Sequence, residues 1–299
     1  MVRAGLVVIV AALVTACSGA RIVYSQLDWL VPAYVSGLVT LDRTQSTQLE
    51  RHMHAVLKWH CGTQFPGYTA VLHTINADFQ AGRMTPARLD AHYERLLDYW
   101  RAIREQAAPR LGTLLATATD AQVEELFVGL EEKNREFMEE FVDRKPARLR
   151  KDADKILRSR LDSWVGDLTP EQRRMVSDWA ARIPLSGADR LDGRRQWQAA
   201  LRLALTHRDQ PEHFNSAVYT LFVHPERYST TAYSEKSDRI REHTLTLLAD
   251  IGATLTPEQR DHLSLRAADW AGDFERLSCS TKPVREEADT SPEPGGFSF

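Results

Sequence analysis

The chain has 299 residues, of which 43% are hydrophobic and 26% are charged, and its formal net charge at pH 7 is −3. This length and hydrophobic content are enough for a sizeable core, either in one large domain or in two closely packed ones. So small a net charge gives no support for a nucleic-acid-binding protein or for a strongly charged partner surface.

The N-terminus resembles a bacterial lipoprotein signal, in which Arg3 precedes an apolar run that ends with Val-Thr-Ala-Cys at residues 14–17. The run is well short of the roughly twenty residues that a membrane-spanning helix needs, so it fits a signal peptide. We expect removal of residues 1–16 and a lipid on Cys17 that anchors the mature chain. Ser18 stands where an Asp would favour retention in the inner membrane, so the predicted location is the outer membrane, on its periplasmic face. The alternative is a simple secretory peptide with a chance cysteine.

The segment that follows predicts an amphipathic helix, with His60 on its apolar face and Trp59 beside His60 near the end. The stretch from Gly62 to Pro66 is expected to break the helix, and Tyr68 to begin the next one. A corner formed by Trp59, His60, Pro66 and Tyr68 is interpreted mainly as structural. A polar binding site at the same corner is the alternative.

Apolar residues recur at steps of three and four through the rest of the chain, which places them on one face of a helix. Three such stripes are Val123, Leu126, Leu130, Phe137 and Phe141; Trp197, Leu201 and Leu205; and Leu263, Ala267, Trp270, Phe274 and Leu277. Stripes of this kind usually form core, although they could also line a ligand groove. We predict an all-α fold, a multi-helix bundle of about eight to ten amphipathic helices over residues 17–279. Two subdomains could meet near 145–167, and the Pro-, Gly- and acid-rich residues 280–299 read as a disordered tail.

The basic run at 144–160 contains eight Lys or Arg residues interleaved with Asp. This pattern favours a solvated helix with ion pairs along it, and contact with anionic membrane lipid is the alternative.

Two helix starts carry the identical pentapeptide Leu-Thr-Pro-Glu-Gln, at residues 168–172 and 255–259. In each copy the Thr can cap the helix, the Pro suits the first helical position, and the Gln can reach back to the N–H of the cap. We therefore predict capping boxes, listed here as Thr169 with Gln172 and Thr256 with Gln259. Looser versions occur at 41–45 and 118–122. This Leu-Thr-x-x-Gln pattern resembles that of Spy and related periplasmic chaperones, which implies a surface that holds unfolded clients.

Nearly the whole chain is similar to an uncharacterised family of Gram-negative helical lipoproteins. The positions that carry the resemblance are Cys17, Arg21, Tyr24, Gln45, Gln48, Trp59, His60, Pro66 and Tyr68. The chain departs from the family pattern at Cys61, where the family has Arg, and at Gln64 and Phe65. The resemblance implies a helical lipoprotein and assigns no activity.

No arrangement of residues indicates an enzyme. His52 and His54 diverge on a helix and His60 lies eight residues beyond His52, so the three do not make a metal site. The motifs of zinc proteases, serine hydrolases, phosphate-binding loops and redox dithiols are missing from the sequence. We therefore predict no catalytic residue, no metal and no cofactor, although a site assembled from distant residues stays open.

Cys61 and Cys279 are the only thiols left once Cys17 is acylated. The periplasm is oxidising, which favours a disulfide between them over two free thiols. The predicted function is that of a non-catalytic periplasmic binding or envelope-maintenance protein, held at the membrane by its lipid, with a protein partner or an unfolded client and no nucleic acid. A Spy-like chaperone is the alternative, and a metal-dependent enzyme is a more distant one.

Overall fold

A computed structural model describes residues 24–279, so the signal peptide, Cys17, Arg21 and the tail at 280–299 lie outside the described residues. Residues 24–279 form helices joined by short turns, which confirms the predicted all-α bundle. The helices are α3 (Leu27–Ser36), α4 (Arg43–Thr63), α5 (Phe65–Gln80), α6 (Pro86–Leu115), α7 (Asp120–Phe141), α8 (Pro146–Val165), α9 (Pro170–Arg182), α10 (Gly187–Leu205), α11 (Pro211–Val223), the 3-10 helix η1 (Pro225–Tyr228), α12 (Thr231–Ala253) and α13 (Pro257–Leu277).

The described residues form eleven α-helices rather than the eight to ten expected from the sequence. Pro184 follows the end of α9, Pro211 opens α11 and Pro225 opens η1. A proline cannot donate the backbone hydrogen bond of a helix interior, so these residues divide the 170–228 segment into short pieces. The predicted break at Gly62 to Pro66 is narrower than expected, because only Gln64 separates α4 from α5.

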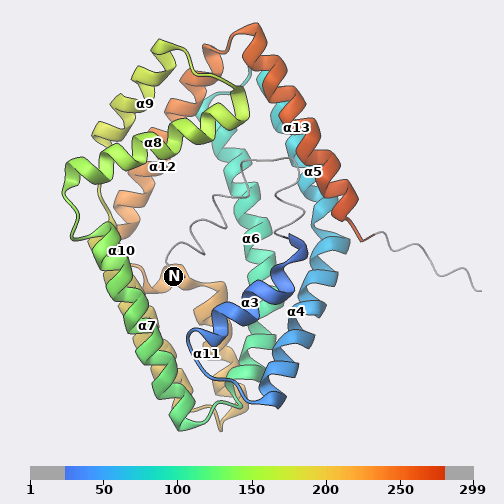
Figure 1. Cartoon of the computed structure of the whole chain (residues 1–299), viewed down its shortest axis with the longest axis vertical. Coiled ribbons are helices and arrows are strands. Elements are labelled where there is room, and N and C mark those ends of the chain that lie inside the picture. The colour runs from blue at the N-terminus through green and yellow to red at the C-terminus, as the bar shows by residue number, and fades with distance from the viewer. Residues whose placement is uncertain (1–23, 280–299) are drawn as a thin grey trace, which may run out of the picture.

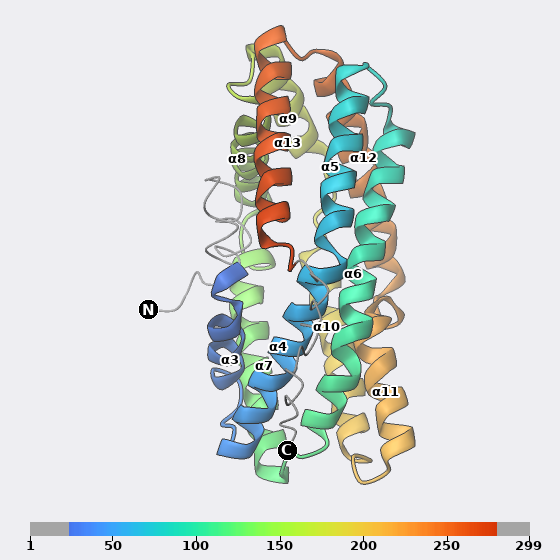
Figure 2. The ribbon, with the colours of Figure 1, turned by 90° about the vertical axis from the view of Figure 1, so that its right-hand side faces the viewer.

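The helices run mostly along the long axis of the molecule (Figure 2). Helices α7 and α10 pack together along one long edge, while α5 and α13 pack together along the opposite edge (Figure 1). Between the two edges, α6 packs against both α11 and α12. No helix of residues 24–279 is long and apolar enough to cross a membrane.

The two ends of the molecule repeat one arrangement. At the lower end in Figure 1, the side-chain amides of Gln45 and Gln122 bond to each other, at N–O distances of 3.0 and 2.6 Å. At the upper end, Gln172 and Gln259 form the same reciprocal pair, at 3.0 and 2.9 Å. The neighbours correspond as well, since α3 packs on α4 as α8 packs on α9. The repeated capping sequences therefore belong to two similar helix arrangements rather than to a solenoid.

Each half has its own apolar cluster. The upper cluster comes from α8, α9, α12 and α13 and consists of Leu161, Val165, Leu168, Val176, Leu247, Ile251, Leu255 and Leu263. The lower cluster comes from α7, α10 and α11 and consists of Val123, Leu201, Ala204, Leu205, Phe214, Val218 and Leu221. Three residues of the lower cluster, Val123, Leu201 and Leu205, also line a large cavity.

Candidate functional site

A cavity of about 1130 Å³ lies in the lower half of the molecule, between α3, α4, α6, α7, α10 and the segment from Phe222 to Tyr233. Ligand sites in proteins usually measure roughly 300 to 1,000 Å³, so this volume suits a small molecule of considerable size. A second cavity, between α9 and α12, is only about 250 Å³ and has mostly polar and charged side chains around it. The larger cavity is therefore the candidate functional site.

The lower part of the cavity is apolar. Its walls include Leu111, Leu114 and Leu115 from α6, Val123, Leu126 and Leu130 from α7, and Leu201 and Leu205 from α10. Several of these residues belong to the stripes read from the sequence as core. These stripe residues do pack in the lower apolar cluster, but the same faces of α7 and α10 are also directed in part toward the cavity. A face of this composition favours an apolar ligand through the hydrophobic effect.

Four arginines line the same cavity, Arg101 and Arg104 from α6 and Arg190 and Arg194 from α10. Arg101 forms an ion pair with Asp98 at 2.9 Å. Within residues 24–279, the other three have no carboxylate within 4 Å. The Nε atom of Arg104 is buried and has no hydrogen-bond partner among the described residues. A buried guanidinium N–H without an acceptor is unfavourable. Because this Nε atom is closed off from the cavity, an anion there would contact Arg104 through the terminal nitrogens of its guanidinium group.

Arg190 and Arg194 are positioned by the aromatic ring of Phe137 on α7. Their guanidinium carbons lie 5.3 and 5.2 Å from the ring centroid, which is within cation–π range. Arg194 also donates from Nε to Oδ1 of Asn134, at 3.1 Å. Burial, and then the neighbouring charge of Arg190, lower the pKa of the Arg194 guanidinium. Both causes disfavour the charged form of Arg194, and a bound anion would counteract them.

Helix α3 forms part of the cavity wall through Tyr34 and Val35, yet none of its own residues is fully buried. Two of its large apolar side chains are open to solvent, with Trp29 64% and Tyr34 44% exposed, and the others are half-buried. Large apolar side chains that are exposed to solvent often mark a contact surface. Helix α3 is therefore both a wall of the cavity and an apolar surface.

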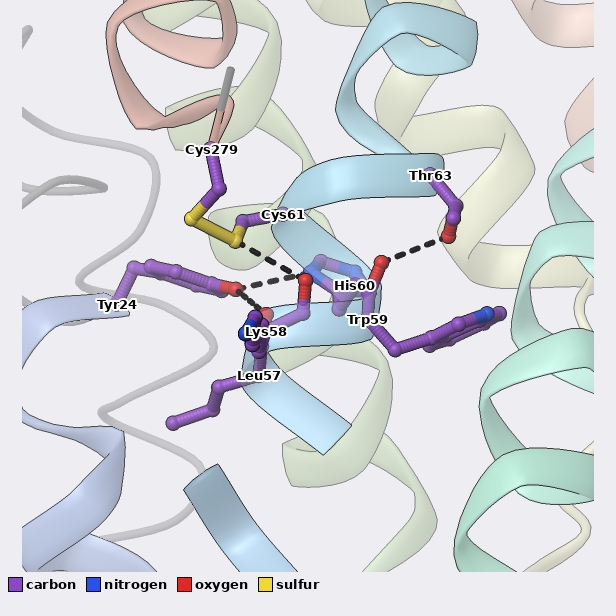
Figure 3. Close-up of a disulfide and its surroundings, with 8 residues drawn as sticks. All are labelled: Tyr24, Leu57, Lys58, Trp59, His60, Cys61, Thr63 and Cys279. Atoms are coloured by element: carbon purple, nitrogen blue, oxygen red, sulfur yellow. Dashed lines mark hydrogen bonds between the residues drawn. A yellow bond between two sulfur atoms is a disulfide. The ribbon is translucent and has the colours of Figure 1, made fainter. Parts of the chain in front are cut away.

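The predicted corner is an aromatic cluster centred on His60, and Figure 3 shows His60 with Tyr24 on one side of it. His60 bonds through Nδ1 to the hydroxyl of Tyr24 at 3.2 Å and through Nε2 to the hydroxyl of Tyr68 at 2.9 Å. Phe65 packs edge-on against His60. Burial lowers the pKa of His60 to about 4 and raises the pKa of each tyrosine to about 12.

Both ring nitrogens of His60 are therefore used within the protein, and the ring is neutral at pH 7. Trp59 lies on the other side of α4 from the disulfide (Figure 3), and Pro66 occupies the first turn of α5. Because His60 is bonded to Tyr24 and Tyr68 through both ring nitrogens, these contacts favour a structural role for the corner over a binding site. The sequence placed Phe274 on an apolar stripe but did not connect it with this corner, where its ring stacks on Phe65.

A disulfide joins Cys61 on α4 to Cys279 just after α13, across 218 residues of sequence. The Cα atoms lie 5.1 Å apart, within the usual range for a disulfide. The bond ties the end of the last helix to the α4–α5 corner, next to His60 (Figure 3). It lies apart from the cavity lining and has a structural place in the fold.

The capping residues occupy the positions inferred from the sequence. Thr169 and Thr256 each accept a hydrogen bond from the backbone N–H of the Gln three residues on, and each Gln accepts one from the N–H of its Thr. What the sequence did not reveal is the pairing of the two Gln side chains across 87 residues. The same pairing at Gln45 and Gln122 places both of these amides in the wall of the cavity.

Two further polar groups have structural roles. The carboxylate of Asp78, at 1% exposure, accepts hydrogen bonds from Arg83, Arg88 and His92 and fixes the turn between α5 and α6. These hydrogen bonds, that of Arg88 first, keep the pKa of Asp78 well below its usual range. The basic run lies on α8 and its flanks, where Arg144 and Arg158 pair with Asp152 and Asp154, as expected for a solvated helix.

Among residues 24–279, no group of three or more His, Cys, Asp or Glu side chains has the geometry of a metal site. The cavity itself was missed at the sequence level, because separating a core-facing residue from a cavity-facing one requires the positions of the neighbouring helices. The only sequence signal was the recurrence of Arg at positions 101, 104, 190 and 194 beside apolar stripes.

Comparison with known proteins adds one result about ancestry. No curated protein and no solved structure matches the chain. A model of a family of unknown function, DUF6279, matches residues 37–234, which include α4 to α11 and nearly all of the cavity lining. Because this match covers more than half of the 299 residues, the chain belongs to the DUF6279 family of unknown function.

Proposed function

We propose that the protein is a lipid-anchored periplasmic binding protein, without catalytic activity, that holds an apolar small molecule in the cavity of its lower half. The observation that carries the proposal is the cavity of about 1130 Å³, with leucine side chains from α6, α7 and α10 along its walls. Burial of apolar ligand surface in such a site is worth about 25 cal/mol per Å² before the losses of association are subtracted.

The predicted lipid on Cys17 supports the same proposal. Seven residues separate Cys17 from Tyr24, and an extended chain of that length spans at most about 25 Å. Such a tether would keep α3, with its exposed Trp29 and Tyr34, close to the outer membrane. Because α3 is also a wall of the cavity, an apolar molecule would have a short path from the lipid into the site.

The binding test uses N-phenylnaphthylamine, a neutral apolar dye whose fluorescence rises in an apolar environment. We expect saturable binding of about one dye per protein molecule. Substituting Leu126→Trp together with Leu130→Trp would fill part of the cavity and should weaken dye binding at least tenfold. Leu265→Trp is the matched control, because Leu265 is 67% exposed on α13, outside the cavity lining. Undiminished dye binding by the filled variant would refute the proposal.

A Spy-like chaperone is the second candidate, and one observation favours it. Tyr93, Leu96 and Trp100 lie on one face of α6 and are 40%, 47% and 55% exposed. These side chains, together with the Leu-Thr-x-x-Gln sequences, would suit an unfolded client. The chaperone hypothesis predicts that near-stoichiometric amounts suppress aggregation of a denatured client and that Leu96→Ser weakens this effect. The binding-protein hypothesis predicts that Leu96→Ser leaves dye binding unchanged.

A further inference from the structure

The cavity combines two chemically different regions. The three arginines without a carboxylate partner lie on two helices, Arg104 on α6 and Arg190 and Arg194 on α10. Eleven residues separate Arg104 from Leu115, and eleven separate Arg194 from Leu205. At the helical rise of 1.5 Å per residue, each interval corresponds to about 16 Å along the helix.

Leu115 and Leu205, at the ends of these two helical segments, both contact the lower apolar cluster, which we call the apolar floor. Leu205 belongs to the lower apolar cluster, and Leu115 packs against that cluster. Both helices also end at this floor, where Arg208 after α10 donates a hydrogen bond to the carbonyl of Ala118 after α6, at 2.9 Å. Since both helices run toward the floor, Arg104 and Arg194 lie at a similar height above it, and Arg190 lies one helical turn farther away. The cavity thus has a cationic zone about 16 to 22 Å above an apolar floor.

The charges around the cationic zone are not balanced. Glu226 is the only carboxylate in the lining of the cavity within residues 24–279, and it is exposed and bonded to His224 at 3.2 Å. Arg190 and Arg194 share one face of α10 four residues apart, and their like charges disfavour each other. An anion placed among these groups would gain charge-assisted hydrogen bonds from side chains that otherwise have no acidic partner.

From this arrangement we infer that the ligand is a single-chain anionic amphiphile, whose carboxylate or phosphate head group binds Arg104, Arg190 and Arg194 while its alkyl chain extends to the apolar floor. This inference rests on the proposed binding function and adds the charge and shape of the ligand. Fatty acids and monoacyl phospholipids share this chemistry. A neutral lipid would leave the three guanidinium groups without an anionic partner.

The test compares three competitors with the same twelve-carbon chain: dodecanoate, dodecyl phosphate and 1-dodecanol. Each displaces N-phenylnaphthylamine from the full-length mature protein. We expect at least one of the two anions to compete at a concentration tenfold or more below that of 1-dodecanol, since charge-assisted hydrogen bonds are stronger than those a neutral hydroxyl makes. A preference for dodecanoate points to fatty acids, and a preference for dodecyl phosphate points to phospholipid head groups.

The double variant Arg104→Gln with Arg190→Gln should reduce the preference for the anions to about twofold and leave the competition by 1-dodecanol unchanged. The single variant Arg104→Gln provides the same comparison if the double variant does not fold. Arg174→Gln is the control, because Arg174 is exposed on α9 and outside the cavity lining. Equal competition by all three compounds in the wild type, or an undiminished preference in the arginine variants, would overturn the inference. Dye binding that survives filling of the cavity would instead reject the underlying binding function.

Discussion

The buried pair formed by Gln172 and Gln259 gives the sharpest prediction about stability. Gln172 is fully buried, and its amide donates hydrogen bonds to Gln259 at 3.0 Å and to the carbonyl of Thr254 at 3.2 Å. Its Oε1 atom accepts from the backbone N–H of Thr169 at 3.0 Å and from the amide of Gln259 at 2.9 Å. One side chain therefore satisfies polar groups on three separate segments.

Gln172→Leu keeps a similar volume and removes every one of these bonds. The N–H of Thr169, the carbonyl of Thr254 and the amide of Gln259 would each lose a partner in a buried site, at about 1 to 3 kcal/mol apiece. We expect the free energy of unfolding to fall by about 3 to 6 kcal/mol, measured by urea denaturation followed by circular dichroism.

The double variant Gln172→Leu with Gln259→Leu should lose at least about 1 kcal/mol less than the sum of the two single variants, because the first substitution already breaks the shared bonds. Gln196→Leu on the exposed side of α10 is the matched control and should change stability by no more than about 0.5 kcal/mol. A Gln172→Leu protein as stable as this control would refute the reasoning.

Four further predictions follow from other parts of the chain. Thr169→Ala and Thr256→Ala should each cost about 1 kcal/mol in the free energy of unfolding, and wild-type stability in both would reject the capping role. Reduction of the Cys61–Cys279 disulfide should lower stability by up to about 5 kcal/mol, as expected for the closure of so long a loop, and protein purified from the periplasm should show no alkylatable thiol before reduction. The pKa of His60 is about 4 in the folded protein, against a reference value of 6.5. Between pH 4 and 6.5 the unfolded state therefore binds more protons than the folded state, so stability falls as the pH drops. We expect a loss of about 1 to 2 kcal/mol from pH 6.5 to pH 4, which allows for partial solvent screening of the ring. Urea midpoints across this range measure the slope, which His60→Gln should reduce. Cys17→Ala should leave the chain unprocessed or release it from the outer membrane, and normal mature mass in the outer-membrane fraction would reject the anchor.

Much of the fold was accessible from the sequence because the signals for it are local. The apolar steps of three and four residues predicted helices, and the Thr-x-x-Gln sequences placed the starts of α9 and α13. The chain has only three cysteines, and because a lipid is predicted on Cys17, Cys61 and Cys279 could be named as a pair. The number of helices was underestimated because the effect of Pro184, Pro211 and Pro225, which divide the 170–228 segment into short helices, depends on the neighbouring segments.

The candidate site was not accessible in the same way because its parts come from distant segments. Leu126 and Leu201 look the same in the sequence as leucines of the core, and only the spacing between α6, α7 and α10 leaves a cavity beside them. The importance of Arg104 depends on the absence of an acidic neighbour within residues 24–279, which no local pattern reveals. Trp59 and His60, by contrast, stood out in the sequence, and both ring nitrogens of His60 are bonded within the protein.

Covalent labelling of the cavity tests the central claim most directly. The probe is a dodecanoate analogue that carries a diazirine at the end of its chain, which inserts into neighbouring bonds when it is illuminated. We predict that peptides containing Leu115, Leu126 or Leu201 are labelled, and that an excess of dodecanoate prevents the labelling. Label confined to the upper half of the molecule or to the exposed face of α6, or label that dodecanoate does not prevent, would contradict this prediction.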